Sequence, residues 1–82
     1  MYYVYILLSI KNNKPYVGYT SKMVKERLDE HNVGTNKWTR NNGPFKLLYY
    51  ESYYCKKDAI HRENFLKGGV GKKLVKIIKE NF

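Results

Sequence analysis

Three short stretches of apolar and aromatic residues alternate with polar segments along the chain. Residues 2–10 carry no charge, and residues 16–20 and 45–54 are likewise rich in aromatic and aliphatic side chains. Runs of this length and type are typical of β-strands, in which successive side chains point to opposite faces. The Asn-rich segment 11–14 favours a tight turn, because Asn tolerates positive φ. The pattern therefore predicts a hairpin and a later third strand.

Apolar residues recur at helical spacing in the remaining segments. They predict one helix over residues 23–32, a second that runs from a polar turn at residues 55–58 to Lys67, and a third over residues 72–81. Residues 35–43 combine Asn, Gly, Lys and Thr around an aromatic side chain, which indicates a loop with one short helical turn.

Two details refine the first and last helices. Thr20 or Ser21 is expected to cap the first helix, because a hydroxyl oxygen there can accept a backbone N–H bond. In the last helix Leu74, Ile77 and Ile78 are expected to face inward, opposite a lysine-rich face. A pair of glycines predicts a flexible joint between the last two helices.

The order of these elements defines the fold class. Strand, hairpin, strand, helix, loop, strand, helix and helix predict an α/β domain, with a three-stranded, largely antiparallel sheet flanked by helices. A length of 82 residues suits a single domain spanning residues 1–82. The order of the strands within the sheet does not follow from the pattern.

The charge balance indicates the class of partner. Sixteen Lys and Arg oppose seven Asp and Glu, a formal net charge of +9, which attracts polyanions. Nucleic acid is the favoured partner, an anionic membrane surface is its rival, and a merely solvated basic surface is the plain alternative. Most of these cations are lysines, which suit phosphate attraction better than base reading. The expected phosphate contacts are Lys11, Lys14, Arg40, Lys72, Lys73 and Lys76.

Compartment is inferred from two simple features. A single cysteine excludes a disulfide within the chain, which favours a reducing compartment. No apolar run approaches the roughly 20 residues of a membrane span, and the N-terminus lacks the basic region of a signal peptide. The expectation is a cytoplasmic protein without a membrane partner.

The two hairpin strands present tyrosines on defined faces. Tyr3 and Tyr5 share one face of the first strand, and Tyr16 and Gly18 share one face of the second. Gly18 has no side chain, which permits another group to approach the backbone closely. A bulge or a bend explains this glycine equally well.

Three polar residues of the predicted helices are candidates for chemistry. Arg27 and His31 are four residues apart, so their side chains point the same way. Glu63 falls in the apolar stripe that contains Ala59 and Leu66. A carboxylate there is costly unless it is paired, binds a metal or faces a cleft.

These residues together resemble the ordered motifs of the GIY-YIG endonucleases. Tyr3-Val4-Tyr5 resembles the first motif of that family, and Tyr16-Val17-Gly18 resembles the second. Arg27 stands at the position of the family's arginine, His31 at that of a common histidine, and Glu63 at that of the metal-binding glutamate. The resemblance covers nearly the whole chain and is strongest to small stand-alone, excinuclease-subunit-C-like members.

The resemblance implies a metal-dependent endonuclease that hydrolyses phosphodiester bonds, with DNA favoured over RNA as the substrate. Glu63 would hold one divalent ion, Mg²⁺ or Mn²⁺, and Arg27 would clamp the non-bridging phosphate oxygens. Tyr5 or Tyr16 would activate or orient the attacking water, and His31 would shuttle a proton or hold a phosphate. Tyr3, which replaces the first glycine of the first motif, is expected to narrow the cleft.

Each assignment has a structural alternative. The tyrosines could be plain strand aromatics, and Glu63 could simply pair with Arg62 or Lys67. A catalytically weak nucleic-acid-binding module is the second function considered. A protein-interaction domain is the third, and it explains the charge poorly. Trp38 and His61 are taken as structural. The form of the substrate, its sequence specificity and the oligomeric state stay open.

Overall fold

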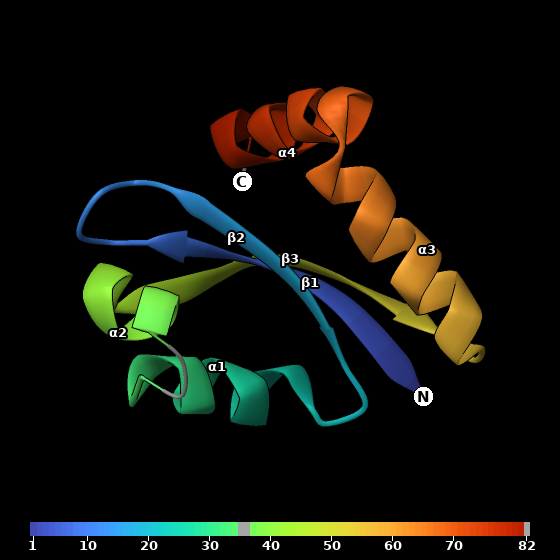
Figure 1. Ribbon diagram of the computed structural model, residues 1–82, viewed down its shortest axis with the longest axis horizontal. Helices are drawn as coiled ribbons and strands as arrows, with labels where there is room; N and C mark the ends of the chain where they lie inside the picture. The colour runs from blue at the N-terminus through green and yellow to red at the C-terminus, as the bar shows by residue number, and fades with distance from the viewer. Residues whose placement is uncertain (35–36, 82) are drawn as a thin grey trace.

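The three apolar stretches form one antiparallel sheet with the strand order β2-β1-β3 (Figure 1). The computed structural model describes residues 1–34 and 37–81. The strands are β1 (Tyr2–Ser9), β2 (Pro15–Thr20) and β3 (Phe45–Tyr53). The predicted hairpin joins β1 to β2, and Asn13 in its turn has a positive φ of 61°. The predicted antiparallel sheet is therefore confirmed, and β2 and β3 are its edges.

Helices cover both faces of this sheet. They are α1 (Val24–Asn32), α2 (Lys37–Asn42), α3 (Lys56–Lys67) and α4 (Gly69–Asn81). Figure 1 shows α1 and α2 on one side of the strands and α3 and α4 on the other. The expected α/β domain with a helix-flanked sheet is thus confirmed. None of the helices among residues 1–34 and 37–81 is long and apolar enough to cross a membrane.

The alternation of side chains along β1 divides the interior into two clusters. Val4 and Ile6 point to the α3/α4 side, and Tyr5 and Leu7 point to the α1 side. All four are 1% exposed or less, because β1 is the central strand and both of its faces are covered. The first cluster consists of Val4, Ile6, Val17, Ala59, Leu66, Val75 and Ile78. The second consists of Tyr5, Leu7, Val24 and Phe45.

The last helix begins three residues earlier than the sequence predicts. α4 starts at Gly69 rather than Lys72, and Lys72 N–H donates to the Gly68 carbonyl at 2.8 Å. The reason is a close contact between the last two helices. Gly71 is buried, and a Cβ atom added there would lie 1.8 Å from the Phe65 carbonyl oxygen. Gly71 therefore belongs to a packed contact rather than to a flexible joint.

The inward face of α4 is centred on other residues than expected. Gly71, Val75 and Ile78 form the buried stripe, at the spacing of successive helical turns. Ile77, which was expected to face inward, is 56% exposed. The prediction for Ile77 was wrong because this side chain lies about 120° around the helix from Gly71, outside the buried stripe.

Two further segments differ in detail from expectation. The N-terminus of α1 has Met23 at the cap position and no side-chain cap bond. Thr20 Oγ1 instead accepts a bond from Lys22 N–H at 3.0 Å, which closes the turn before the helix. The predicted loop over residues 35–43 contains α2 from Lys37 onward, and its residues 35 and 36 lie outside the described part of the chain.

Candidate functional site

The centre of the site is the side chain of Tyr5 on the middle strand. Tyr5 lies opposite Gly18 in the β1–β2 ladder, and a Cβ atom on Gly18 would lie 2.5 Å from the Tyr5 hydroxyl. The tyrosine ring therefore lies across the backbone of β2, where only glycine leaves room for it. Of the two explanations for Gly18, the close approach is confirmed.

Two side chains of α1 meet this hydroxyl. His31 Nε2 and the Tyr5 hydroxyl form a hydrogen bond of 2.8 Å, and Arg27 Nε donates to the same oxygen at 3.4 Å. The expectation that Arg27 and His31 point the same way is confirmed. Their shared target also explains why α1 packs on this face of the sheet.

The electrostatic environment of Tyr5 connects it to two more of the predicted residues. Burial raises the pKa of the Tyr5 hydroxyl to about 12, against the opposing effect of Arg27. Negative charge on Tyr16 and on Glu63 would raise this pKa further, to a smaller extent. Side chains from β1, β2, α1 and α3 thus act on one hydroxyl, which is neutral at pH 7.

His31 is fully buried beneath the tyrosines. Burial lowers the pKa of the imidazole, and the nearby charge of Arg27 lowers it further, so the ring is neutral near pH 7. Its edge contacts the ring of Tyr16, with centroids 4.9 Å apart. The second ring nitrogen, Nδ1, has no hydrogen-bond partner within the described part of the chain. With an exposed fraction of 0%, His31 can bind Tyr5 but cannot reach a phosphate at the surface.

Arg27 lies between this buried pair and solvent. Its Nη1 atom donates to Glu30 Oε1 at 2.9 Å, and the guanidinium side chain is 30% exposed. Glu30 also binds Lys22. The carboxylate of Glu30 raises the pKa of Arg27 and fixes the orientation of the guanidinium. Sequence reasoning missed Glu30, although its spacing of three residues from Arg27 on one helix was a usable signal.

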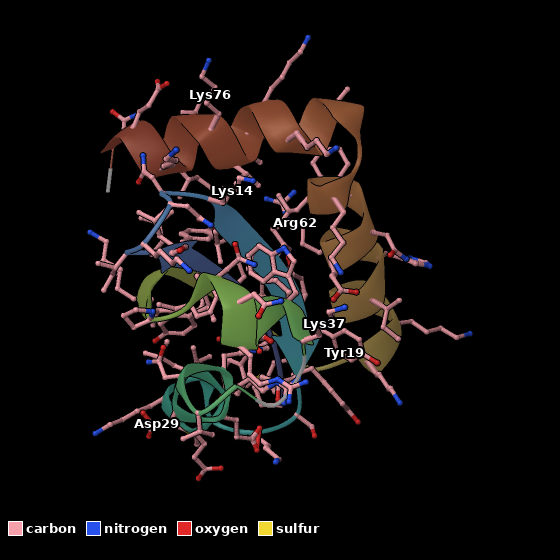
Figure 2. The ribbon with its side chains drawn as sticks, turned by 60° about the vertical axis from the view of Figure 1, so that its left-hand side comes forward. Lys14, Tyr19, Asp29, Lys37, Arg62 and Lys76 are labelled. Atoms are coloured by element: carbon pink, nitrogen blue, oxygen red, sulfur yellow. The ribbon has the colours of Figure 1, made fainter. Side chains whose placement is uncertain are left out.

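Glu63 reaches towards the site from the other side of the sheet. The side chain is 14% exposed, and Oε2 accepts from Lys67 Nζ at 3.3 Å. Arg62 is not its partner. Arg62 extends from α3 towards the sheet (Figure 2), where Nε lies 3.0 Å from Oε1 of Glu51. One of the two predicted ion pairs, that with Lys67, is therefore present.

The donor set around Glu63 limits how a metal could be held. No group of three or more His, Cys, Asp or Glu side chains is close enough to share an ion among residues 1–34 and 37–81. Glu63 would thus hold an ion with at most one further side chain of these types from the described residues. Mg²⁺ and Mn²⁺ fit such a position, because Mg²⁺ usually keeps several waters and binds one or two carboxylates together with phosphate oxygens.

Tyr16 is the more accessible of the two motif tyrosines. Its ring is half-buried and stacks on Trp38 of α2, with centroids 5.1 Å apart and planes inclined by 27°. Tyr5, in contrast, is 1% exposed. Trp38 also stacks on Phe45, with centroids 5.6 Å apart. Trp38 was taken as purely structural, yet it is 36% exposed beside Tyr16.

Tyr3 lies in a different hollow on the same face. Its ring packs edge-on against Tyr50, with centroids 6.1 Å apart, and its hydroxyl lies 3.9 Å from Met23 Sδ. This hollow of about 360 Å³ is not lined by Tyr5 or Tyr16. Tyr3 therefore packs against β3 and the start of α1 rather than between the tyrosines and Glu63.

The expected phosphate contacts are all exposed, and two of them line a groove. Lys11 donates to the Asn41 carbonyl at 3.2 Å, which holds it on α2. Lys72 and Lys76 of α4 line a groove beside β2, together with Lys67 and Lys79, which the sequence analysis had not assigned to nucleic acid. Figure 2 labels Lys76 on α4 and Lys14 on the hairpin. The other expected phosphate contacts, which do not line the groove, are Lys14, Arg40 and Lys73.

The comparisons with known proteins show the family of this small α/β domain. The model of the GIY-YIG catalytic domain matches residues 1–76. The chain therefore belongs to the GIY-YIG family, which is a family of nucleases. The resemblance identified from Tyr3-Val4-Tyr5 and Tyr16-Val17-Gly18 is confirmed.

Its relatives are members of the UPF0213 group. A UPF0213 protein of Clostridium perfringens is 43% identical over 68 residues, which cover 82% of this chain and 71% of the relative. A UPF0213 protein of Staphylococcus haemolyticus is 36% identical over 80 residues, which cover 96% of this chain and 95% of the relative. No solved structure is a significant match.

Proposed function

We propose that this protein is a metal-dependent endonuclease that hydrolyses phosphodiester bonds in DNA. The supporting observation is the environment of the Tyr5 hydroxyl, which Arg27 and His31 contact directly and on which Tyr16 and Glu63 act electrostatically. These side chains come from elements on both sides of the sheet, within a chain that belongs to a nuclease family. The preference for DNA over RNA rests on the family alone.

Arg27 is assigned to the phosphate. Its guanidinium is charged at every relevant pH, is partly exposed and is held by Glu30 at 2.9 Å. A donor that is fixed before the reaction stabilises the charge that develops on the non-bridging oxygens, without reorganising at that moment. We expect this to be the largest contribution from a single side chain of the protein.

The two tyrosines are assigned different roles. The hydroxyl of Tyr5 is buried and has a pKa of about 12, so it neither reaches substrate nor acts as a base at pH 7. Tyr5 is a positioning residue, which holds Arg27 and is itself held by His31. Tyr16 is half-buried and remains accessible, so we assign it to orienting the attacking water.

Glu63 is assigned to the divalent ion. When bound, Mg²⁺ or Mn²⁺ supplies Lewis acidity at the phosphate and stabilises the leaving oxygen. The present partner of Glu63 is Lys67, whose side chain is 51% exposed. Ion pairs with such an exposed partner contribute about 0–1 kcal/mol, so Glu63 can exchange this lysine for a cation at little cost.

The test is cleavage of a panel of labelled DNA and RNA structures with Mg²⁺, with Mn²⁺ or with chelator. We expect cleavage of DNA that requires the metal and is lost in Glu63→Gln. The matched control is Glu80→Gln, because Glu80 is exposed on α4 and the change in charge is the same. Wild-type cleavage rates in Glu63→Gln would contradict the assignment.

A second candidate function is a nucleic-acid-binding module with little catalytic activity. It is favoured by the four lysines that line the groove beside β2. The same panel separates the two candidates. Salt-sensitive binding to DNA without metal-dependent cleavage would support the binding module and reject the nuclease.

A further inference from the structure

A groove of about 600 Å³ runs beside the edge strand β2. Its lining includes apolar residues of β2, α3 and α4. The rest of the lining has two parts: an aromatic wall, with rings from β2 and α2, and a lysine wall, with ammonium groups from α3 and α4. The residues that supply these walls are Tyr16, Trp38, Lys67, Lys72, Lys76 and Lys79.

The aromatic wall is continuous with the proposed catalytic site. Tyr16 lines the groove and also contacts the ring of His31, which binds the Tyr5 hydroxyl. Trp38 stacks on Tyr16 with nearly parallel planes and keeps 36% of its surface exposed. A ligand in the groove would therefore touch Trp38 and lie next to the side chain that we assign to the attacking water.

The lysine wall gives the groove a positive charge, of which the share from Lys67 is offset by its ion pair with Glu63. Lys72, Lys76 and Lys79 are spaced by one helical turn along α4, and Lys67 faces them from the end of α3. No Asp or Glu lines the groove within the described part of the chain. Low-dielectric walls with charges of one sign concentrate the opposite charge, so the ligand should be an anion with an apolar, flat part.

We propose that this groove holds an unpaired stretch of the DNA strand that is cut, with one base stacked on Trp38 and the adjoining phosphates on the lysines. The inference rests on the proposed nuclease function and specifies its substrate. A base within a duplex has both faces covered by its neighbours, so only an unpaired base can offer a face to Trp38. A basic groove with an aromatic platform is the general arrangement by which proteins hold single strands. The protein should therefore favour single strands and single-stranded flanks over continuous duplex.

The first experiment measures binding alone, in chelator, so that no strand is cut. Trp38 is the only tryptophan of the chain, so its fluorescence reports directly on this groove. An oligothymidine should quench the fluorescence saturably, and bind at least tenfold more tightly than a blunt hairpin duplex of the same length. An acidic peptide of equal charge should not quench it. Equal quenching by the duplex, or quenching by the peptide alone, would overturn the proposal.

Variants test the two walls separately, with anisotropy of a labelled oligothymidine as the readout. Trp38→Leu should weaken binding about 5- to 150-fold, the fold-change expected when stacking of one base is lost, and Trp38→Phe should restore most of it. Circular dichroism checks that both variants are folded. If Trp38→Leu folds and binds like the wild type, the stacking site is rejected. If Trp38→Leu does not fold, the binding of Trp38→Phe and the fluorescence titration of the wild type test the stacking site instead.

The lysine wall predicts a change in salt dependence. The double variant Lys72→Gln/Lys76→Gln should lower the slope of log affinity against log salt by about 1.4, that is about 0.7 for each phosphate contact with a single strand. Lys57→Gln on the exposed surface of α3 is the control, and its slope should not change. An unchanged slope in the double variant would place the strand elsewhere.

The outcome also separates this inference from the nuclease proposal. Groove binding in chelator with no cleavage in Mg²⁺ or Mn²⁺ would support the groove and reject the nuclease. Metal-dependent cleavage that prefers continuous duplex, with no quenching of Trp38, would support the nuclease and reject the groove.

Discussion

The two faces of the central strand differ in chemistry although they share one backbone. The face towards α3 and α4 buries Val4 and Ile6 against Ala59 and Leu66, and its partly buried carboxylate, Glu51, is paired with Arg62. The face towards α1 buries Tyr5, whose hydroxyl binds a histidine that is itself fully buried. Burial of polar groups costs free energy unless they are hydrogen-bonded, and Nδ1 of that histidine has no partner within the described chain.

The difference indicates a division of labour between the two faces. The α3/α4 face supplies stability through apolar packing and a paired polar cluster around Glu51, and the α1 face carries the energetic cost of an incompletely paired buried histidine. Glu63 belongs to α3 yet acts on the Tyr5 hydroxyl on the other face. It can do so because α3 packs against β2, the edge strand, so groups from both faces can meet there.

The largest predicted effect comes from removing the hydroxyl of a motif tyrosine, and it should differ between Tyr16 and Tyr5. Tyr16→Phe should lower the single-turnover cleavage rate by about 10²-fold or more, because it removes the accessible hydroxyl that orients water. Its free energy of unfolding should change little, because the ring is only half-buried and its packing is kept. A wild-type rate in Tyr16→Phe would contradict the role assigned to this hydroxyl.

Tyr5→Phe provides the comparison on the buried side. The substitution leaves Nε2 of His31 without its 2.8 Å partner in a fully buried position. The free energy of unfolding should therefore fall by about 1–3 kcal/mol, measured by urea denaturation. The cleavage rate should also fall, because Arg27 loses its bond to Tyr5. An unchanged stability would show that the buried pair contributes nothing to folding.

Substitutions of two glycines in α4 test how closely α3 and α4 pack, which should affect stability but not cleavage. Gly71→Ala places a methyl group 1.8 Å from the Phe65 carbonyl oxygen, so it should destabilise the fold by about 1–3 kcal/mol or more. Gly69→Ala meets no atom within 4 Å and should be neutral or stabilise by about 0.4–1 kcal/mol. Urea denaturation compares the two. Equal stabilities would mean that α3 and α4 do not pack closely at this point.

A smaller effect is expected in the pH dependence of stability. The pKa of His31 is lowered by burial, so below about pH 6.5 the unfolded chain binds a proton that the folded chain resists. Stability should therefore be complete above about pH 6.5 and decline as the pH falls from there towards the lower folded pKa.

Two histidine variants provide the measurement. His31→Gln should flatten the decline below about pH 6.5, and His61→Gln, at an exposed site on α3, should leave it in place. Denaturation at a series of pH values would show the difference. A decline that persists in His31→Gln would assign the pH dependence to other groups.

Local patterns predicted most of the fold. Alternation placed Val4 and Tyr5 on opposite faces, and the four-residue spacing placed Arg27 and His31 side by side. Each of these inferences depends on neighbours within one strand or one helix, where geometry is regular. The composition of the ordered motifs also identified the family, which the comparison confirms over residues 1–76.

The contacts between distant segments could not be predicted in the same way. The strand order, the ring of Tyr5 over Gly18 and the stacking of Trp38 on Tyr16 all depend on how elements pack. The start of α4 was predicted too late because Gly69, Val70 and Gly71 were expected to lie before the helix, and only the close contact of Gly71 with α3 explains why they belong to it. The groove follows from these same contacts.

Arg27 on α1 and Glu63 on α3 lie on opposite sides of the sheet, and we propose that they act on one phosphodiester bond. The most direct test is a double-mutant cycle on the single-turnover cleavage rate in Mn²⁺, with Arg27→Ala, Glu63→Gln and both together. The cleavage rate of each single variant should fall by at least about 10²–10³-fold. The double variant should be only slightly slower than the less active of the two single variants, because the effects of residues that act as a unit are non-additive. A double variant whose loss equals the product of the two single losses, or a single variant that keeps the wild-type rate, would contradict the account.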